Sequence, residues 1–247
     1  MFSFDLGNEQ SAYFLVTNKH VVQGTAKGRF FFTRRDGDNP VIGQRWDVEL
    51  DAFETRWHGH PKSDVDVAVM PLVPLLEFAE ASGQNVFFRS VPDSLVPTPD
   101  QLKELDAIEE VMFVGYPSGI YDNVNLMPIV RRGTTATPLQ LDYDGRPVFL
   151  VDASVFPGSS GSPVVLWNRG SYTTRDGGVV IGSRFFLLGI MAEVAFREEH
   201  GQIDFVSIPT ANVPVVRTKE MIDLGVVYKS SAILEAAADF LRSRHLL

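Results

Sequence analysis

The sequence predicts an all-β protein, and two observations support this prediction. Short runs rich in β-branched and aromatic residues, separated by Gly, Pro and Asn, occupy most of the 247 residues, a pattern typical of a barrel or a sandwich. These runs come close to two sets of six, and a stretch at 91–108 that is rich in Pro, Asp and Glu lies between the sets. We therefore expect an N-terminal β unit at 1–98, a second β unit at 99–229 and a C-terminal helix at 230–247.

The expected strands follow one another with short connections. In the first unit they lie at 12–17, 29–33, 46–53, 65–70 and 86–89. In the second unit they lie at 111–115, 127–135, 147–153, 163–167, 185–193 and 204–209. The polar, glycine-rich segment 168–183 joins the expected strands at 163–167 and 185–193. It is expected to form either an extended hairpin near the functional face or an inert surface loop.

Helix signals are few, and the strongest lies at the C-terminus. Segments 75–82 and 99–105 are short candidates. In the last segment the apolar side chains follow the i, i+1, i+4, i+7, i+8 spacing of a helix that packs one face on a core. They are Ile233, Leu234, Ala237, Phe240 and Leu241. Ser230 or Ser231 precedes this stripe and is the expected N-cap.

The charge balance argues against nucleic acid as a partner. The net charge is −9, the pI is about 5.0, and no run of Lys or Arg occurs. The only clustered bases are the pairs Arg34-Arg35 and Arg131-Arg132, which we expect to face solvent at the ends of hairpins or strands. Apolar residues make up 45% of the chain, enough to bury a large core.

Cysteine is absent, which excludes disulfides, thiolate zinc sites and a cysteine nucleophile. The first residues show neither a basic n-region nor an apolar h-region, and no run approaches the roughly 18 apolar residues that a membrane span needs. We therefore expect a soluble cytoplasmic protein without a membrane partner, or a protein of the bacterial envelope if a leader has been removed.

Segment 156–163, Phe-Pro-Gly-Ser-Ser-Gly-Ser-Pro, is the most informative stretch for function. It sets Ser160 next to Gly161 and just before an apolar run. A serine nucleophile needs a base and a site that holds an oxyanion, and a glycine-containing turn can aim successive backbone N–H groups into one concave spot. Taken alone, the segment is explained equally well as an ordinary turn.

Two further segments supply the missing groups. His20 follows the apolar run 13–16, so a strand would deliver it to a site between elements. Asp66 begins the β-branched run 66–69. Asp64 competes with it, because in a strand both would project to the same side. We favour Asp66, since an apolar-Ala-apolar pattern follows it directly.

The order along the chain is His20, Asp66 and Ser160, with separations of 46 and 94 residues. This set resembles the chymotrypsin-fold, trypsin-like serine proteases, whose separations are about 45 and about 93. The resemblance is to the cysteine-free bacterial branch that includes the HtrA/Do-type catalytic domains. It runs from about residue 12 to about residue 210.

Three motifs carry the resemblance. Segment 158–163 resembles the family's G-x-S-G-G-P, segment 17–20 resembles [ST]-A-x-H, and segment 66–69 resembles D-[LIV]-A-[LV]. Two positions depart from it: Ser162 replaces the second glycine, and Asn18 replaces the usual alanine. Both changes are mild.

The resemblance implies a fold and a reaction. The fold would be two packed six-stranded antiparallel β-barrels with a C-terminal helix, the first barrel carrying His20 and Asp66 and the second Ser160. Ser160 would attack a peptide carbonyl, His20 would transfer its proton and Asp66 would orient the imidazole, while the N–H groups of Gly158 and Ser160 would form the oxyanion hole. The expected substrate is a polypeptide, with no cofactor and no metal.

Ser159 bears on activation. In the digestive and clotting branches this position holds an aspartate that pairs with a freshly cut N-terminus. Serine offers no charge, so we expect a site that is either constitutively competent or controlled by loop ordering or a regulatory partner. The C-terminal helix leaves no room for a PDZ module, so we expect no peptide-sensing control of the HtrA kind.

Five residues are expected to bind substrate on the same resemblance. They are Ser154, Val155, Ala192, Glu193 and Val194. The first two would form the floor of the primary pocket and the others would lie along the substrate backbone. No carboxylate stands at the floor, so we expect a small or medium apolar residue at the cleaved position rather than Arg or Lys.

Two alternatives to a peptidase stay open. One is a protease-fold binding or effector module with little or no activity by itself. The other is an α/β-hydrolase esterase, which would need the order Ser, Asp, His and alternating helices that the sequence lacks. The pair His58 and His60 lacks identifiable further ligands for a metal, and we expect both histidines to be solvated in a loop.

Overall fold

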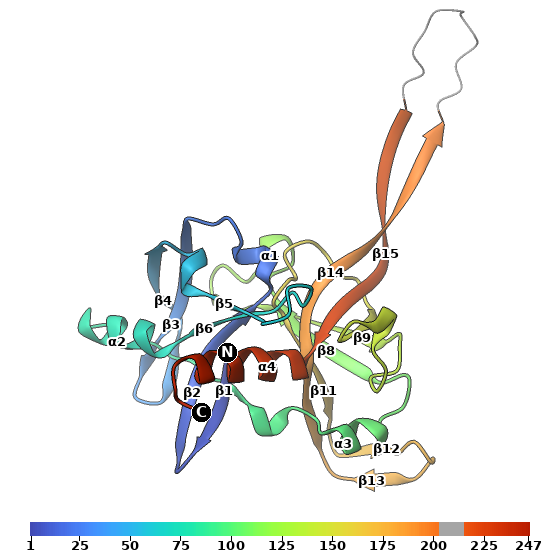
Figure 1. Ribbon diagram of the computed structural model, residues 1–247, viewed down its shortest axis with the longest axis horizontal. Coiled ribbons are helices and arrows are strands. Elements are labelled where there is room, and N and C mark those ends of the chain that lie inside the picture. The colour runs from blue at the N-terminus through green and yellow to red at the C-terminus, as the bar shows by residue number, and fades with distance from the viewer. Residues whose placement is uncertain (203–214) are drawn as a thin grey trace, which may run out of the picture.

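The computed structural model describes residues 1–202 and 215–247, with side chains described for 1–192 and 223–247 (Figure 1). The expected strand at 204–209 lies outside these residues. The described chain is mostly β, as predicted, and its two halves differ in how their strands are joined.

The second half forms a closed barrel of six strands in the order β10-β15-β14-β11-β8-β9, and every neighbouring pair is antiparallel. The strands are β8 (Glu110–Gly115), β9 (Ile129–Thr135), β10 (Val148–Asp152), β11 (Pro163–Asn168), β14 (Arg184–Gln202) and β15 (Val215–Lys229). Alternate residues of β8, such as Val111 and Phe113, are buried in the barrel core together with Phe149, Val151 and Leu166. The predicted six-stranded barrel is therefore confirmed for this half.

The first half contains an open five-stranded sheet in the order β5-β6-β2-β1-β7 and a separate hairpin. The sheet strands are β1 (Phe2–Gly7), β2 (Gln10–Thr17), β5 (His58–Gly59), β6 (Ala68–Pro71) and β7 (Val91–Pro92). The hairpin strands are β3 (Lys27–Asp36) and β4 (Asn39–Asp51). The edge strands β5 and β7 have only two residues each, and neither pairs with a strand of the hairpin.

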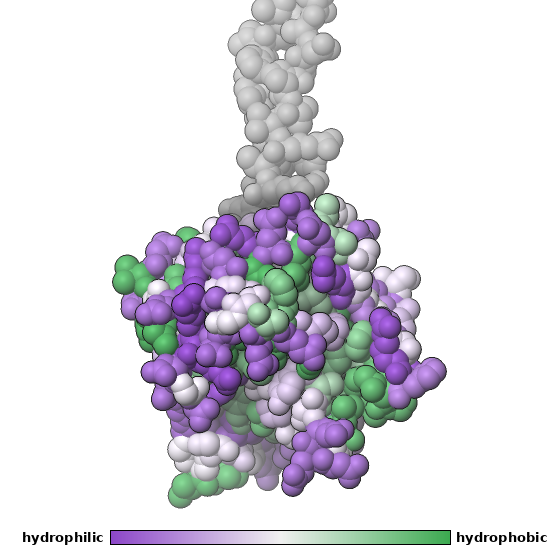
Figure 2. All heavy atoms as spheres, turned by 90° about the vertical axis from the view of Figure 1, so that its left-hand side faces the viewer, coloured by the Kyte–Doolittle hydropathy of each residue, from purple (hydrophilic) through white to green (hydrophobic). Residues whose placement is uncertain are grey.

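The hairpin reaches the rest of its half by one bridge, between Arg34 and Val86, and by side-chain packing. Phe32 and Val48 share a buried cluster with Met70 at the end of β6. A closed second barrel of six hydrogen-bonded strands is thus not present among the described residues. The side that carries this hairpin is mostly polar at its surface, with apolar residues in separate patches (Figure 2).

Helix α4 lies across the seam between the two halves (Figure 1). Its buried face shares one core cluster with Phe14 of the first half and Ile190 of the second. The helices are α1 (Lys19–Val22), α2 (Val73–Ala81), α3 (Pro99–Lys103) and α4 (Ser230–Ser243), and the 3-10 turns are η1 (Glu54–Arg56), η2 (Asp93–Leu95), η3 (Pro117–Gly119) and η4 (Tyr143–Gly145). The predicted C-terminal helix is confirmed.

Two details of the helix and hairpin predictions are corrected. The chain passes directly from β15 into α4, so the N-cap is Lys229, without a side-chain cap, and Ser230 is already helical. The segment 168–183 does form a hairpin, β12 (Ser171–Thr173) and β13 (Val179–Ile181). It lies at the α3 end of the barrel, far from α1 (Figure 1), where Arg175 donates a hydrogen bond to the carbonyl of Lys103. None of the helices described is long and apolar enough to cross a membrane.

Candidate active site

The short helix α1 presents His20 at the end of β2. Asn18, its N-cap residue, is fully buried, and its side-chain amide donates a 2.8 Å hydrogen bond to the backbone carbonyl of Asp66. This contact fixes the start of α1 against the segment that precedes β6. The sequence marked Asn18 only as a departure from a motif, and its side chain ties two of the three expected site segments together.

The carboxylate of Asp66 contacts His20 twice. Its Oδ2 lies 2.6 Å from His20 Nδ1, and its Oδ1 accepts the backbone N–H of His20 at 3.0 Å. Asp64 is exposed, and its carbonyl accepts the hydroxyl of Tyr228. Asp66 is therefore the carboxylate that meets the histidine, and it holds both the ring and the backbone of His20.

The hydroxyl of Ser160 completes this chain of contacts. Ser160 Oγ lies 3.1 Å from His20 Nε2 and 2.9 Å from the carbonyl oxygen of Ala192. Because a carboxylate can only accept, Nδ1 of His20 carries the proton and Nε2 is free to accept from the serine. One hydroxyl proton serves two acceptors, so rotation about the Cβ–Oγ bond selects between His20 and Ala192.

The turn around Ser160 has the backbone geometry that only glycine adopts easily. Gly158 and Gly161 have φ values of +83° and +80°. A Cβ at Gly158 would lie 3.2 Å from the nitrogen of Ser118, and one at Gly161 would lie 2.8 Å from Thr17 Oγ1. Both glycines therefore let the turn approach neighbouring chain segments closely.

Two N–H groups of this turn have no hydrogen-bond partner among the described residues. The amides of Ser159, Gly161 and Ser162 donate to backbone carbonyls, whereas those of Gly158 and Ser160 donate to no described residue. The carbonyl of Pro157 accepts the N–H of Ser118 at 2.8 Å. In a trans peptide the N–H points opposite to the C=O, so this bond turns the N–H of Gly158 away from Ser118.

Arg131 of β9 lies beneath the turn. It donates through Nη2 to Ser159 Oγ at 2.9 Å and through Nη1 to the carbonyl of Ser154 at 3.0 Å, and its guanidinium stacks on Phe113. Burial lowers the pKa of Arg131 from its ordinary value. The expectation that Arg131 faces solvent is wrong, because its Nη1 and Nη2 both donate hydrogen bonds to the segment 154–159. Arg132 does face solvent, where it pairs with Glu110.

Lys19 is the cation next to the site. Its Nζ donates to the carbonyl of Lys62 at 2.8 Å. Burial lowers the pKa of Lys19, while the carboxylates of Asp66 and Asp64 act in the opposite direction.

The expected substrate-binding residues occupy different surroundings. Ser154 is exposed. Val155 is 1% exposed and belongs to the barrel core, where it packs beside Met191 and the backbone of Gly225, so it does not line an open pocket. Ala192 is buried and offers its carbonyl to Ser160.

The other two expected residues, Glu193 and Val194, lie in β14 opposite Val226 and Gly225 of β15. Their side chains are outside the described set. Their backbone continues the strand that passes Ser160.

His58 and His60 are not solvated loop residues. Their Nε2 atoms lie 2.7 Å from Asp239 and 3.1 Å from Glu235, two carboxylates of α4, and His60 is buried. Within the described part of the chain, no group of three or more His, Asp or Glu side chains is arranged to hold a metal ion.

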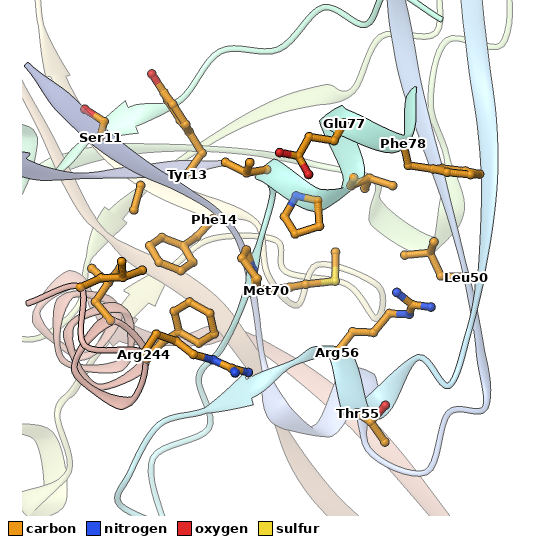
Figure 3. Close-up of a pocket in the computed structure, with 18 of the residues that line it drawn as sticks. Ser11, Tyr13, Phe14, Leu50, Thr55, Arg56, Met70, Glu77, Phe78 and Arg244 are labelled. Atoms are coloured by element: carbon orange, nitrogen blue, oxygen red, sulfur yellow. The ribbon is translucent and has the colours of Figure 1, made fainter. Parts of the chain in front are cut away.

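A large hollow of about 1060 Å³ lies elsewhere, between β2, β4, β6, α2 and the end of α4 (Figure 3). Phe14, Leu50, Met70 and Phe78 are among its mostly apolar lining, and the side chains of Arg56 and Arg244 lie at one side. None of the three residues His20, Asp66 and Ser160 lines it, so it is separate from the candidate site.

Comparisons with known proteins point to one family. A family model described as a trypsin-like peptidase domain matches residues 5–172. No curated protein matches the sequence. Among solved structures, the crystal structure of Rv3671c from M. tuberculosis, in the inactive form of a serine-to-alanine mutant, is 15% identical with a TM-score of 0.38, and the match covers 93% of this chain and 80% of that chain. The part matched by the family model includes His20, Asp66 and Ser160.

Proposed function

Because this chain belongs to the trypsin-like peptidase family, we propose that it is a serine endopeptidase that works through His20, Asp66 and Ser160. The observation that carries the proposal is the unbroken line of contacts from Asp66 Oδ2 through the His20 ring to Ser160 Oγ, at 2.6 and 3.1 Å. Both distances lie within the range that general base catalysis needs.

The reaction follows from the roles that these atoms fit. Ser160 Oγ forms a bond to the scissile carbonyl carbon while its proton moves to His20 Nε2, and Asp66 stabilises the imidazolium. The tetrahedral intermediate expels the amine as His20 returns the proton to the leaving nitrogen, which leaves an acyl-enzyme. A water molecule, deprotonated by His20, then releases the acid and restores Ser160.

The oxyanion would bind to the N–H groups of Gly158 and Ser160. The support for this assignment is that both groups lack a partner in the described chain. In addition, the hydrogen bond from Ser118 to the carbonyl of Pro157 turns the N–H of Gly158 away from Ser118. One such donor is typically worth about 3 to 4 kcal/mol in the transition state.

The substrate class we propose is a polypeptide with a small or medium apolar side chain at the cleaved position. Its support is that Val155, which follows the exposed Ser154, and Met191 are each 1% exposed and share one apolar cluster, and that neither position 154 nor 155 holds a carboxylate to bind Arg or Lys. Profiling of a peptide library measures this preference, and dominant cleavage after Arg or Lys would contradict it.

The proposed fold of the first half is the family's other barrel, closed by packing of the β3–β4 hairpin rather than by a continuous ladder. Its support is the cluster that Phe32 and Val48 share with Met70, and the bridge from Arg34 to Val86. This arrangement leaves His20 and Asp66 on the side that meets the second barrel.

A fluorophosphonate probe tests the proposed activity. We expect labelling of the wild type, none of Ser160→Ala and strongly reduced labelling of His20→Ala. An unlabelled, folded wild type would favour the alternative, a protease-fold binding module. Undiminished labelling of His20→Ala would exclude the proposed base.

A further inference from the structure

We infer that His60 is a positioning residue that links helix α4 to the segment carrying Asp66. The inference rests on the proposed function, since it assigns His60 a role in orienting the His20 base. It comes from three sets of contacts: those of the His60 ring, those of the loop 60–67, and those between α4 and the same loop.

The His60 ring is held on both nitrogens. Its side chain is only 1% exposed. Nδ1 accepts the backbone N–H of Lys62 at 3.1 Å, so the ring proton sits on Nε2, which lies 3.1 Å from Glu235 Oε2. A neutral imidazole in this tautomer satisfies both partners, whereas a proton on Nδ1 would face the N–H of Lys62.

The loop that begins at His60 ends just before β6 and contains Asp66. The N–H of His60 donates to the carbonyl of Val67 at 2.8 Å, which closes the loop. The exposed residues 62–64 make further contacts, among them those from Lys19 Nζ to the carbonyl of Lys62 and from the Tyr228 hydroxyl to the carbonyl of Asp64. Lys62 Nζ also lies 3.9 Å from Glu235 Oε2, so Glu235 contacts the loop at two side chains. His60 is the buried side chain that anchors the beginning of this loop.

Helix α4 contacts the loop with two kinds of side chain. Its apolar residues Ile233 and Ala237 share a buried cluster with Val65 and Val67, the neighbours of Asp66 on either side. On its polar side, Glu235 faces His60.

The next turn of α4 repeats the polar contact. Asp239, four residues after Glu235 and hence on the same helix face, lies 2.7 Å from His58 Nε2. Helix α4 thus contacts the chain around and before Asp66 by apolar packing and by two histidine–carboxylate hydrogen bonds.

The consequence for the site is geometric. The 2.6 Å contact between Asp66 and His20 tolerates little displacement, and a shift of about 1 Å in a catalytic group can cost roughly 100-fold in rate. Releasing His60 from Glu235 frees the start of the Asp66 loop, so the carboxylate would sample positions farther from His20 Nδ1.

Three variants separate the two contacts of the ring. Glu235→Ala removes the helix partner. His60→Gln retains a donor near Nε2 but loses the acceptor for Lys62, and His60→Asn retains the acceptor but loses the link to α4. Glu235 is 53% exposed, so its substitution empties no core position and keeps the test valid if a His60 variant does not fold. Glu49→Ala is the matched control, because Glu49 is 57% exposed and pairs only with Lys27.

Two readouts are needed. The first is the proton resonance of His20 Nδ1–H, which a short hydrogen bond to a carboxylate moves downfield and which NMR detects without any hydrolysis. The second is the pair of kinetic constants, kcat divided by the number of probe-labelled sites, and KM. We expect Glu235→Ala and His60→Asn, which break the link to α4, to move the resonance upfield and to lower kcat about tenfold at constant KM. His60→Gln, which keeps that link, should change both quantities less. Glu49→Ala should change neither.

An unchanged resonance in folded Glu235→Ala and His60→Asn would overturn the inference. A loss confined to the number of labelled sites, with kcat per site unchanged, would do the same, because it would mean that the contact serves stability alone. A wild type with the downfield resonance but without peptidase activity would contradict the proposed function and still leave the role of His60 measurable.

Discussion

The guanidinium of Arg131 donates a 2.9 Å hydrogen bond to the hydroxyl of Ser159, the residue just before Ser160. Ser159 is 2% exposed, and its hydroxyl donates in turn to the carbonyl of Phe156 at 2.6 Å. Through its other nitrogen Arg131 reaches the carbonyl of Ser154. An internal side chain therefore braces the turn at the position where the digestive relatives use a newly cut N-terminus.

Arg131→Met should slow probe labelling of Ser160 about tenfold or more. The variant keeps much of the packing on Phe113 but leaves the carbonyl of Ser154 and the hydroxyl of Ser159 without their donor. Hydrogen bonds to charged groups are worth about 1.5 to 3 kcal/mol when buried, and less here because Arg131 is partly exposed. The second-order labelling rate and the melting temperature measure the effect. A wild-type labelling rate would show that the brace is dispensable.

Ser159→Asp should be tolerated only while Arg131 is present. The new carboxylate would lie against the guanidinium, a pair that geometry favours, whereas with Arg131→Met it would be a buried charge without a partner. We expect a coupling free energy of about 1 to 3 kcal/mol from a double-mutant cycle of unfolding. Additive effects of the two substitutions would contradict the predicted contact.

Asn18→Ala should lower stability by about 1 kcal/mol, the usual net value of a hydrogen bond, because it deletes the bond to the carbonyl of Asp66. The loss of kcat should resemble that expected for Glu235→Ala, about tenfold, because both substitutions loosen the segment that carries Asp66. Urea denaturation and kcat per labelled site measure the two quantities. A large loss of kcat with unchanged stability would mean that Asn18 acts in the reaction rather than in the fold.

The sequence was sufficient for the parts of the site that short motifs define. His20, Asp66 and Ser160 each stand at the edge of an apolar run, and their motifs, order and spacing resemble those of a known family, which predicted the contacts between them. The second barrel was predictable for the same reason, because its strands carry local β patterns.

What escaped prediction depends on tertiary contacts. Strand β15 contains the charged and polar run 217–220, which no local β pattern marks as a strand. Its strand conformation therefore depends on pairing with β14. Arg131 and His60 carry polar side chains that a sequence places at the surface, and only the folded chain supplies their buried partners. The burial of Val155 likewise depends on Met191 and Gly225, residues far along the chain beside which its side chain packs.

Gly115→Ala should disrupt the turn that carries Ser160, and Ser162→Gly should repair it. A Cβ at Gly115 would collide with Oγ of Ser162, which is 5% exposed, and would lie 3.1 Å from its Cβ. Ser162 holds the turn by donating its N–H to Ser159 and accepting that of Met191, so its displacement would move Ser160.

Overpacking of this kind typically costs about 1 to 3 kcal/mol, and we expect probe labelling of Gly115→Ala to fall in parallel with stability. Ser162→Gly removes both colliding atoms and restores the glycine of the family motif. The double variant should therefore label and melt close to Ser162→Gly alone. If Ser162→Gly leaves the defect of Gly115→Ala unchanged, the defect arises from another neighbour of Gly115 and the assigned collision is wrong.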